Sequence, residues 1–190
     1  NDHITFHLPP PAPGVPDLPA TIRLRRPIAL TKSVTIDGPG ANLLTLSGDT
    51  DGDGTADVQL LQVSALARIN RLTLTKGSAG FAGGAVSVRP GGSLGISYCA
   101  VTDSQAEQWG GGIDVGARAL DMDHCLIAGN RTIAAVGQGG GGVAIYADQH
   151  CVIENTTFSG NSQLSPGGLG GGGLYVENLH PGTPLLVGVN

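Results

Sequence analysis

The sequence predicts an all-β protein, a right-handed single-stranded parallel β-helix of roughly six coils. The first observation behind this prediction is a phrase that occurs four times, a glycine pair followed by an alternating apolar strand. The second glycines of these pairs lie 28, 30 and 31 residues apart, at Gly84, Gly112, Gly142 and Gly173. A sequence period in this range is typical of a solenoid.

A second phrase, in phase with the first, indicates which solenoid this is. It occurs at 94–101, 120–127 and 151–158, and each copy has apolar residues two apart on both sides of a polar corner. This is the period of a β-strand and not of a helix. Because helical repeats need a helical half, we interpret each repeat as one coil of a parallel β-helix. The right-handed rule for parallel crossovers predicts its handedness.

The earlier part of the chain follows the same scheme less regularly. Apolar pairs two residues apart recur between glycines and prolines; they are Ile22/Leu24, Ile28/Leu30, Val34/Ile36, Leu44/Leu46 and Leu72/Leu74. We therefore expect one β-helix domain over 21–190. Residues 1–20 contain a proline-rich stretch from Leu8 to Pro19, which is typical of polyproline II. They are expected to form an extended segment that caps the first coil.

Composition argues against several classes of function. The formal net charge is −5, which disfavours nucleic acid as a partner because phosphates require a basic face. Aromatic residues make up 4% of the chain, which argues against a large stacking surface for sugars or single-stranded nucleic acid. No apolar run approaches the roughly 20 residues of a membrane span, so no membrane insertion is expected. We expect a soluble chain.

Three cysteines give an odd count. Cys99 and Cys125 fall at equivalent positions of adjacent coils, and Cys151 aligns with the core position of Leu120. Stacked positions can meet the distance that a disulfide needs, although parallel side-chain directions often prevent its geometry. Two interpretations therefore stay open, a Cys99–Cys125 disulfide and three small apolar residues that fill the core.

The sharpest chemical signal is an Asp-rich segment, Asp49 to Asp57. With Asp49 as position 1, carboxylates stand at positions 1, 3, 5 and 9, glycine at 6, and a carbonyl at 7; the predicted metal ligands are Asp49, Asp51, Asp53, Thr55 and Asp57. Four carboxylates this close repel one another without a cation. The sequence therefore predicts a structural calcium loop.

The match to a calcium loop ends after nine residues. Leu60 stands at position 12, where an EF-hand has a bidentate acid, and the flanking segments have the pattern of strands. Over these nine residues the loop resembles those of thrombospondin type 3 and dockerin repeats. The alternative interpretation is an exposed, metal-free Asp-Gly turn between two coils.

Several segments carry a family resemblance. The stretch Ile28 to Ala41, the strand Leu72 to Thr75 and the glycine-pair repeats ending in Ser159-Gly160-Asn161 resemble right-handed parallel β-helix proteins of bacterial surfaces. These are the polymorphic outer-membrane proteins and the secreted proteins with a Cys-Ser-Leu-Arg-Glu-Ala signature, a segment that is missing before Ile4. The resemblance implies an extracellular or cell-surface module with a structural, adhesive or coat-forming role. It implies a surface glycan or neighbouring domains of a longer chain as partners.

Two other functions compete with this interpretation. A pectin-lyase-like, polysaccharide-active enzyme needs carboxylates that converge on one face. The repeats offer one acid per face, and the acids that would have to gather are Asp114, Asp121, Asp123 and Glu154. An ice-binding solenoid needs ranks of threonine, and here Thr73 and Thr75 form a single pair. We therefore expect no catalytic residues.

The remaining polar residues favour structural roles. His124 occupies the corner position of Tyr98 and Asn155, and the other histidines have no zinc-site spacing. Arg23, Arg25 and Arg26 form a basic cluster, in which Arg23 and Arg25 alternate with apolar residues and are interpreted as the solvated face of an early strand. The alternative is a docking site for a glycan acid or a phosphate.

The two ends of the predicted solenoid suggest self-association. Solenoid ends expose unpaired backbone, and the apolar strand Leu185 to Val189 is followed only by Asn190. Stacking of such ends would be a heterologous contact that builds open filaments. Two interpretations stay open: the natural chain continues past this strand into a neighbouring domain, or the end meets another subunit in end-to-end association.

Overall fold

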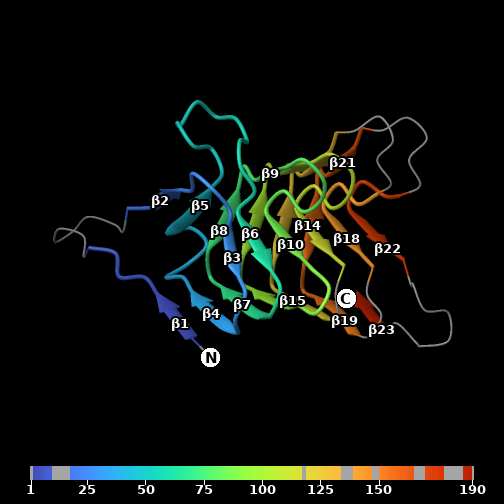
Figure 1. Ribbon diagram of the computed structural model, residues 1–190, viewed down its shortest axis with the longest axis horizontal. Coiled ribbons are helices and arrows are strands. Elements are labelled where there is room, and N and C mark those ends of the chain that lie inside the picture. Colours follow the sequence, from blue (N-terminus) through green and yellow to red (C-terminus); the bar gives the residue numbers. More distant parts are fainter. Residues whose placement is uncertain are drawn as a thin grey trace.

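The computed structural model describes residues 2–9, 18–116, 119–133, 139–146, 150–164, 170–177 and 186–189. It is an all-β parallel solenoid of about five turns (Figure 1). This confirms the predicted all-β parallel solenoid, with about five turns where the sequence predicted roughly six coils. The right-handedness stays a prediction. The described ranges include no helix with the length and apolarity needed to span a bilayer.

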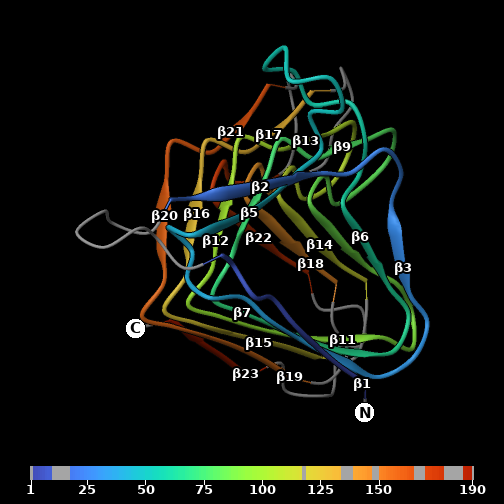
Figure 2. The same ribbon diagram turned by 90° about the vertical axis from the view of Figure 1, so that its left-hand side faces the viewer.

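Four parallel sheets, called A to D here, run along the solenoid and are seen end-on in Figure 2. Sheet A consists of β1 (Asp2–Thr5), β4 (Val34–Asp37), β7 (Leu66–Asn70), β11 (Ser93–Ser97), β15 (Ala119–Asp123), β19 (His150–Glu154) and β23 (Leu186–Val189). Sheet B consists of β2 (Ala20–Arg23), β5 (Leu44–Ser47), β8 (Thr73–Thr75), β12 (Ala100–Thr102), β16 (Leu126–Ala128) and β20 (Thr157–Ser159).

The other two sheets complete each coil. Sheet C consists of β3 (Ile28–Leu30), β6 (Leu61–Val63), β10 (Val86–Val88), β14 (Ile113–Val115), β18 (Val143–Ile145) and β22 (Leu174–Val176). The short sheet D consists of β9 (Ser78–Ala79), β13 (Gln105–Ala106), β17 (Arg131–Thr132) and β21 (Ser162–Gln163). A coil therefore passes from sheet A through B and, from the third coil on, D to sheet C.

The residues at the two ends lie partly outside the description. Residues 2–5, expected in a cap, form β1 and pair with β4, whereas 10–17 of the proline-rich stretch fall outside the described ranges. At the other end 186–189 form β23 on β19, and Leu185 and Asn190 lie outside.

The strand register confirms most of the repeat alignment. Val86 lies beside Ile113, and Leu94 beside Leu120, which in turn lies beside Cys151. One detail of the alignment was wrong. The Gly84 amide donates to the Gly111 carbonyl at 3.1 Å, so the first repeat is offset by one residue and Ala85 aligns with Gly112.

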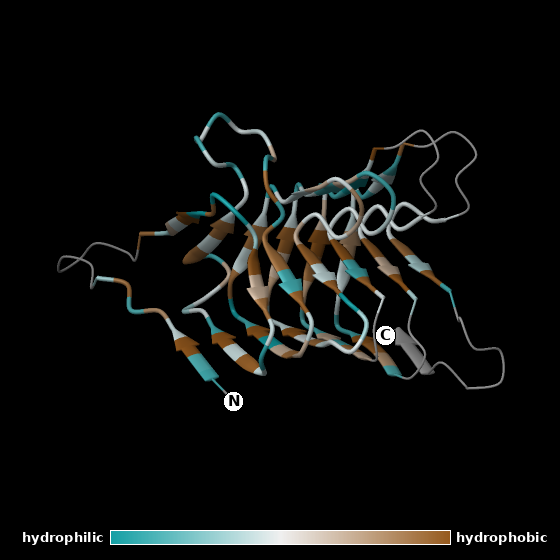
Figure 3. Cartoon of the chain, in the orientation of Figure 1, coloured by the Kyte–Doolittle hydropathy of each residue, from teal (hydrophilic) through white to brown (hydrophobic). Residues whose placement is uncertain are grey.

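Apolar residues alternate with polar ones along many strands, as the brown bands of Figure 3 show, and the buried apolar residues form a narrow core. Along sheet A the inner row is Ile69, Ile96, Met122 and Ile153, each at most 1% exposed. Burial of a side chain of this size contributes about 1.5–3 kcal/mol. Because every coil repeats the row, the core is continuous along the axis.

Residues with a left-handed backbone turn the chain from sheet A to sheet B. Tyr98, His124 and Asn155 have φ of 53°, 50° and 48° at this corner. The Tyr98 and His124 rings stack with centroids 4.7 Å apart. His124 therefore lies at a corner, as predicted, and its ring stacks on the Tyr98 ring of the neighbouring coil.

A buried polar ladder marks the next corner, between sheets B and D. Asn130 is fully buried, and its side chain accepts a hydrogen bond from the Ser104 amide at 3.0 Å and donates to the Val101 carbonyl at 2.9 Å. It also donates to Asn161 Oδ1 at 3.0 Å. The ladder satisfies backbone groups that the turn removes from the sheets.

All three cysteines are free and buried. Cys99 and Cys125 are 2% and 4% exposed, and each thiol lies against carbonyl oxygens of its own and the preceding coil. Burial raises the pKa of Cys99 to about 12 and that of Cys125 to about 11. Of the two open interpretations, the structure therefore favours apolar core residues.

The stacked glycines are required by close contact between coils. A Cβ atom on Gly111 would lie 2.3 Å from the Arg131 carbonyl oxygen and 2.4 Å from that of Gly141, whereas one on Gly80 meets nothing within 4 Å. We expect Gly111→Ala to destabilise the fold by about 3 kcal/mol and Gly80→Ala to have little effect. Urea unfolding of both variants is the measurement; equal midpoints would contradict the close-contact explanation.

Candidate functional site

The Asp-rich loop projects from the stack between β5 and β6, at the top of Figure 1. Its two ends are joined by hydrogen bonds, because the amides of Asp57 and Val58 donate to the Gly48 carbonyl at 3.1 and 3.2 Å. Gly48 itself is fixed to the next coil through the Thr75 carbonyl at 3.0 Å. The loop is therefore closed at its two ends by backbone hydrogen bonds and is attached to the next coil at Gly48.

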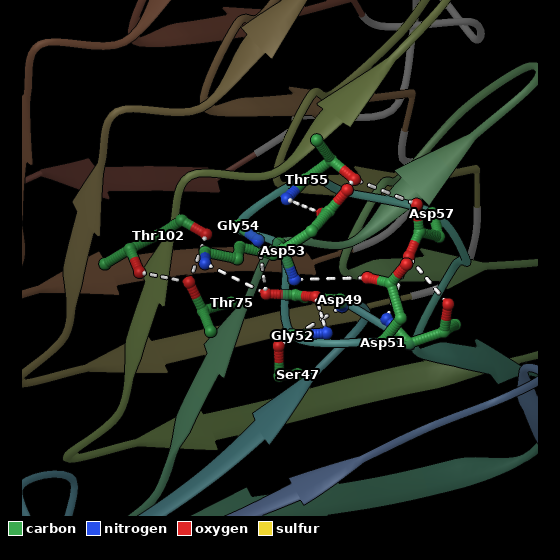
Figure 4. Close-up of polar contacts among 12 residues, drawn as sticks. Ser47, Asp49, Asp51, Gly52, Asp53, Gly54, Thr55, Asp57, Thr75 and Thr102 are labelled. Atoms are coloured by element: carbon green, nitrogen blue, oxygen red, sulfur yellow. Dashed lines mark hydrogen bonds and ion pairs between the residues drawn. The ribbon is translucent and has the colours of Figure 1, made fainter.

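Asp49 organises the loop from within and is 4% exposed. Its carboxylate accepts hydrogen bonds from the amides of Gly52 at 2.6 Å and Gly54 at 3.0 Å (Figure 4). It also forms an ion pair with Lys76 Nζ at 3.1 Å. Burial acts to raise the pKa of Asp49, but Lys76 and the two amides outweigh it and hold the pKa below its ordinary value. Asp49 is thus held as an anion.

Three of the predicted ligands come together. Asp49, Asp51 and Asp57 each place a carboxylate oxygen within 4.8 Å of the others. The Thr50 amide and hydroxyl donate to Asp57 at 2.8 and 2.7 Å, and these bonds lower the pKa of Asp57. Hard oxygen ligands of this kind suit calcium.

Of the other two predicted ligands, Asp53 is not among these three acids, whereas the Thr55 hydroxyl donates to Asp57 of the cluster at 3.1 Å. Asp53 Oδ1 accepts hydrogen bonds from the Thr55 amide at 2.8 Å and the Thr55 hydroxyl at 2.7 Å. Asp53 therefore acts as a turn-forming residue in the loop. Leu60 is fully buried in the core, so position 12 offers no ligand.

A second feature lies over sheet C, a hollow of about 650 Å³ that the sequence did not reveal. Its lining includes Phe81, Ser87, Arg89, Asp114 and Gly116. Ser87 and Asp114 are the outward residues of adjacent strands and are paired in register. The floor of the hollow is therefore the outer surface of β10 and β14.

Asp114 has an unusual environment for an acid. Burial raises its pKa to about 7, although the positive charge of Arg89 acts in the opposite direction. Its carboxylate forms no hydrogen bond with any residue in the described ranges. By contrast Asp123, on sheet A, accepts hydrogen bonds from Asn155 at 2.9 Å and His124 at 2.7 Å, and these lower its pKa.

Three of the four acids considered for an enzyme lie on one face. Asp121, Asp123 and Glu154 lie on the outer face of sheet A, where Asp123 is paired in register with Glu154 and Asp121 lies two residues away on the same strand. Asp114 lies on sheet C, so the set of four is divided between two sheets.

Aromatic side chains gather beside the hollow, which their low number in the sequence did not suggest. The Trp109 ring meets Tyr146 edge-on at 4.7 Å between centroids and Tyr175 at 5.8 Å. The Tyr146 hydroxyl is buried and has no partner among the described residues. The negative charge of Asp114 is one of the causes that raise the pKa of Tyr146, after burial. These rings belong to three successive coils.

No protein-family model, curated protein or solved structure matches this chain. The resemblance to bacterial surface β-helix proteins therefore rests on the repeat motifs alone.

The environment of Asp114 predicts a pH-dependent stability. Its pKa is raised from 3.8 to about 7 on folding, so its contribution is fully present below pH 4 and is lost as the pH rises through 7. We expect Asp114→Asn to be more stable than the wild type at pH 8, by at most about 4 kcal/mol, with the difference shrinking toward pH 4. Urea unfolding at both pH values measures this. The exposed Asp121→Asn is the control, and a constant difference for Asp114→Asn would contradict the prediction.

Proposed function

We propose that this chain is an extracellular structural or adhesive module of a bacterial surface or secreted protein. The observation that carries this proposal is the unbroken parallel stack, in which core, asparagine ladder and glycine contacts all continue from coil to coil. Such a stack forms a stiff body with long exposed faces, which suits a spacer or a binding surface. The motif resemblance supports the same role and an extracellular location.

We further propose that the Asp-rich loop binds calcium and that the ion has a structural role. Asp49, Asp51 and Asp57 supply carboxylate oxygens, and Asp53 and Thr55 shape the turn that presents them. A cation would offset the repulsion among three acids, of which Lys76 neutralises one. Calcium would therefore stabilise the projecting loop on its base.

Calcium is expected to raise the thermal stability of the wild-type chain. At a calcium concentration one hundred times Kd the gain is about 2.7 kcal/mol, relative to the same chain in chelator. Asp51→Asn should abolish most of this gain, because it removes a charged ligand. Asparagine keeps the side-chain oxygen that accepts the hydrogen bond from the Asp53 amide. Differential scanning calorimetry with calcium and with chelator measures both effects.

Asp53→Asn is the matched control for this experiment. It carries the same chemical change two residues away, at an acid outside the three-carboxylate cluster. It should retain most of the calcium effect. Equal melting temperatures of the wild type in calcium and in chelator would refute the calcium proposal.

End-to-end association is the third part of the proposal. In the described residues no strand pairs with the outer edges of β1, β2 and β3, and Ile4, Ile22 and Ile28 there are 39–43% exposed. Parallel edges of this kind accept further strands. Electron microscopy over a concentration series should show filaments that Ile28→Lys shortens. Leu126→Lys is the control, because β16 is paired on both sides and is not an edge strand. Discrete monomers at every concentration would refute association.

A further inference from the structure

Three polar side chains in the hollow over sheet C have no hydrogen-bond or close ion-pair partner among the residues that the structure describes. Ser87 is 7% exposed, Asp114 is half-buried, and Arg89 lies at the rim. Within the described ranges none of their side chains forms a hydrogen bond or a close ion pair. Ser87 is buried and Asp114 is partly buried, and polar residues in such positions are ordinarily hydrogen-bonded, so their lack of a partner among the described residues points to a ligand.

The walls of the hollow are fixed by the fold. The Gln59 side chain donates to the carbonyls of Ala82 at 3.0 Å and Gly83 at 2.7 Å, and Gln62 donates to Gln59 at 2.7 Å. These bonds hold the segment that carries Phe81, whose side chain is 59% exposed. The hollow is therefore preorganised, with an apolar ring at its edge.

The size and lining of the hollow suit a small or extended organic ligand. Its volume of about 650 Å³ falls within the range of roughly 300–1,000 Å³ that is usual for ligand sites. Phe81, Pro27 and Pro90 supply flat apolar surface, and Gly116 leaves open space next to Asp114. Apolar surface with a few polar groups is the composition that such sites have.

The charges and the backbone narrow the class of ligand. Arg89 is the one cation among the described residues of the lining and interacts electrostatically with Asp114, so it leaves little free positive charge for an anionic ligand. The floor strands β10 and β14 are paired on both sides, so no sheet edge is free to bind a peptide strand. Recognition therefore depends on side chains that bind hydroxyl groups and on an apolar ring.

From these observations we infer that the hollow over sheet C binds an uncharged saccharide chain, with Asp114, Ser87 and Arg89 as its polar contacts and Phe81 as its apolar contact. The inference rests on the proposed adhesive function and names its ligand class and its site. Hydroxyl groups of a sugar both donate and accept, so they satisfy a carboxylate, a hydroxyl and a guanidinium together.

The single tryptophan provides the readout, because Trp109 contacts Tyr146, whose ring is near Asp114. The probes are the β-1,4-linked tetrasaccharides of glucose and of N-acetylglucosamine, a tetragalacturonate, and tetralysine. We expect a saturable fluorescence change with a neutral tetrasaccharide. Asp114→Ala and Phe81→Ala should each weaken binding at least tenfold, and Asp121→Ala, the same change on sheet A of the following coil, should not.

Each other outcome overturns the inference in a distinguishable way. A lack of binding to either neutral probe, and to a panel of neutral glycans, refutes the saccharide site and leaves the calcium and stacking experiments to decide the structural role. If a neutral tetrasaccharide still binds to Asp114→Ala and Phe81→Ala, the adhesive function stands but its binding site is not the hollow. Tighter binding of tetragalacturonate or tetralysine refutes the uncharged class, and tetralysine binding that Asp114→Ala abolishes assigns the hollow to a basic peptide.

Discussion

The hydrogen-bonded register between successive coils is the constraint on which this structure depends. Once Val86 is fixed beside Ile113, every neighbouring position must also lie above its equivalent, at the spacing of paired strands. Each position along the coil must therefore hold a side chain that can pack against the equivalent side chain of the next coil. Aliphatic side chains do so in the core, rings do so at the corner of Tyr98 and His124, and amides do so at Asn130 and Asn161. The glycines occupy the rows in which backbone from two coils leaves no room for a side chain.

The same constraint explains how much the sequence could predict. Positions without room for a Cβ atom appear in the sequence as glycine pairs, and the alternating core appears as apolar pairs, so the sequence could predict the fold class and most of the strand alignment. It could not predict the offset at Ala85, because the first repeat has an alanine where the later repeats have glycine. The asparagine ladder was missed because it is built from Ser104, Asn130 and Asn161, which share no single residue type. The hollow was missed because it depends on how several coils juxtapose their outward residues and loops.

Acidic residues in this chain occupy two opposite kinds of environment. Asp49 and Asp57 receive amide, hydroxyl or ammonium donors that stabilise the charged form, whereas Asp114 is shielded from water with no such donors. Sequence spacing could identify the first kind, because a nine-residue loop is local, yet it could not tell that Asp53 turns toward Thr55. The second kind arises only from burial beneath segments distant in sequence. The two environments explain why the acids of the loop gather into a cluster and Asp114 stands alone.

Because hydrogen bonds join Gly48 to Val58, the geometry of the coil does not depend on how long the loop between them is. Because the chain leaves and re-enters the stack at one point, residues can be added or removed between these two without shifting the strands on either side. This corner is consequently a position at which evolution, or an engineer, can exchange one inserted segment for another. The solenoid then serves as a fixed frame on which variable segments are displayed, and diversification of this chain is expected to concentrate there.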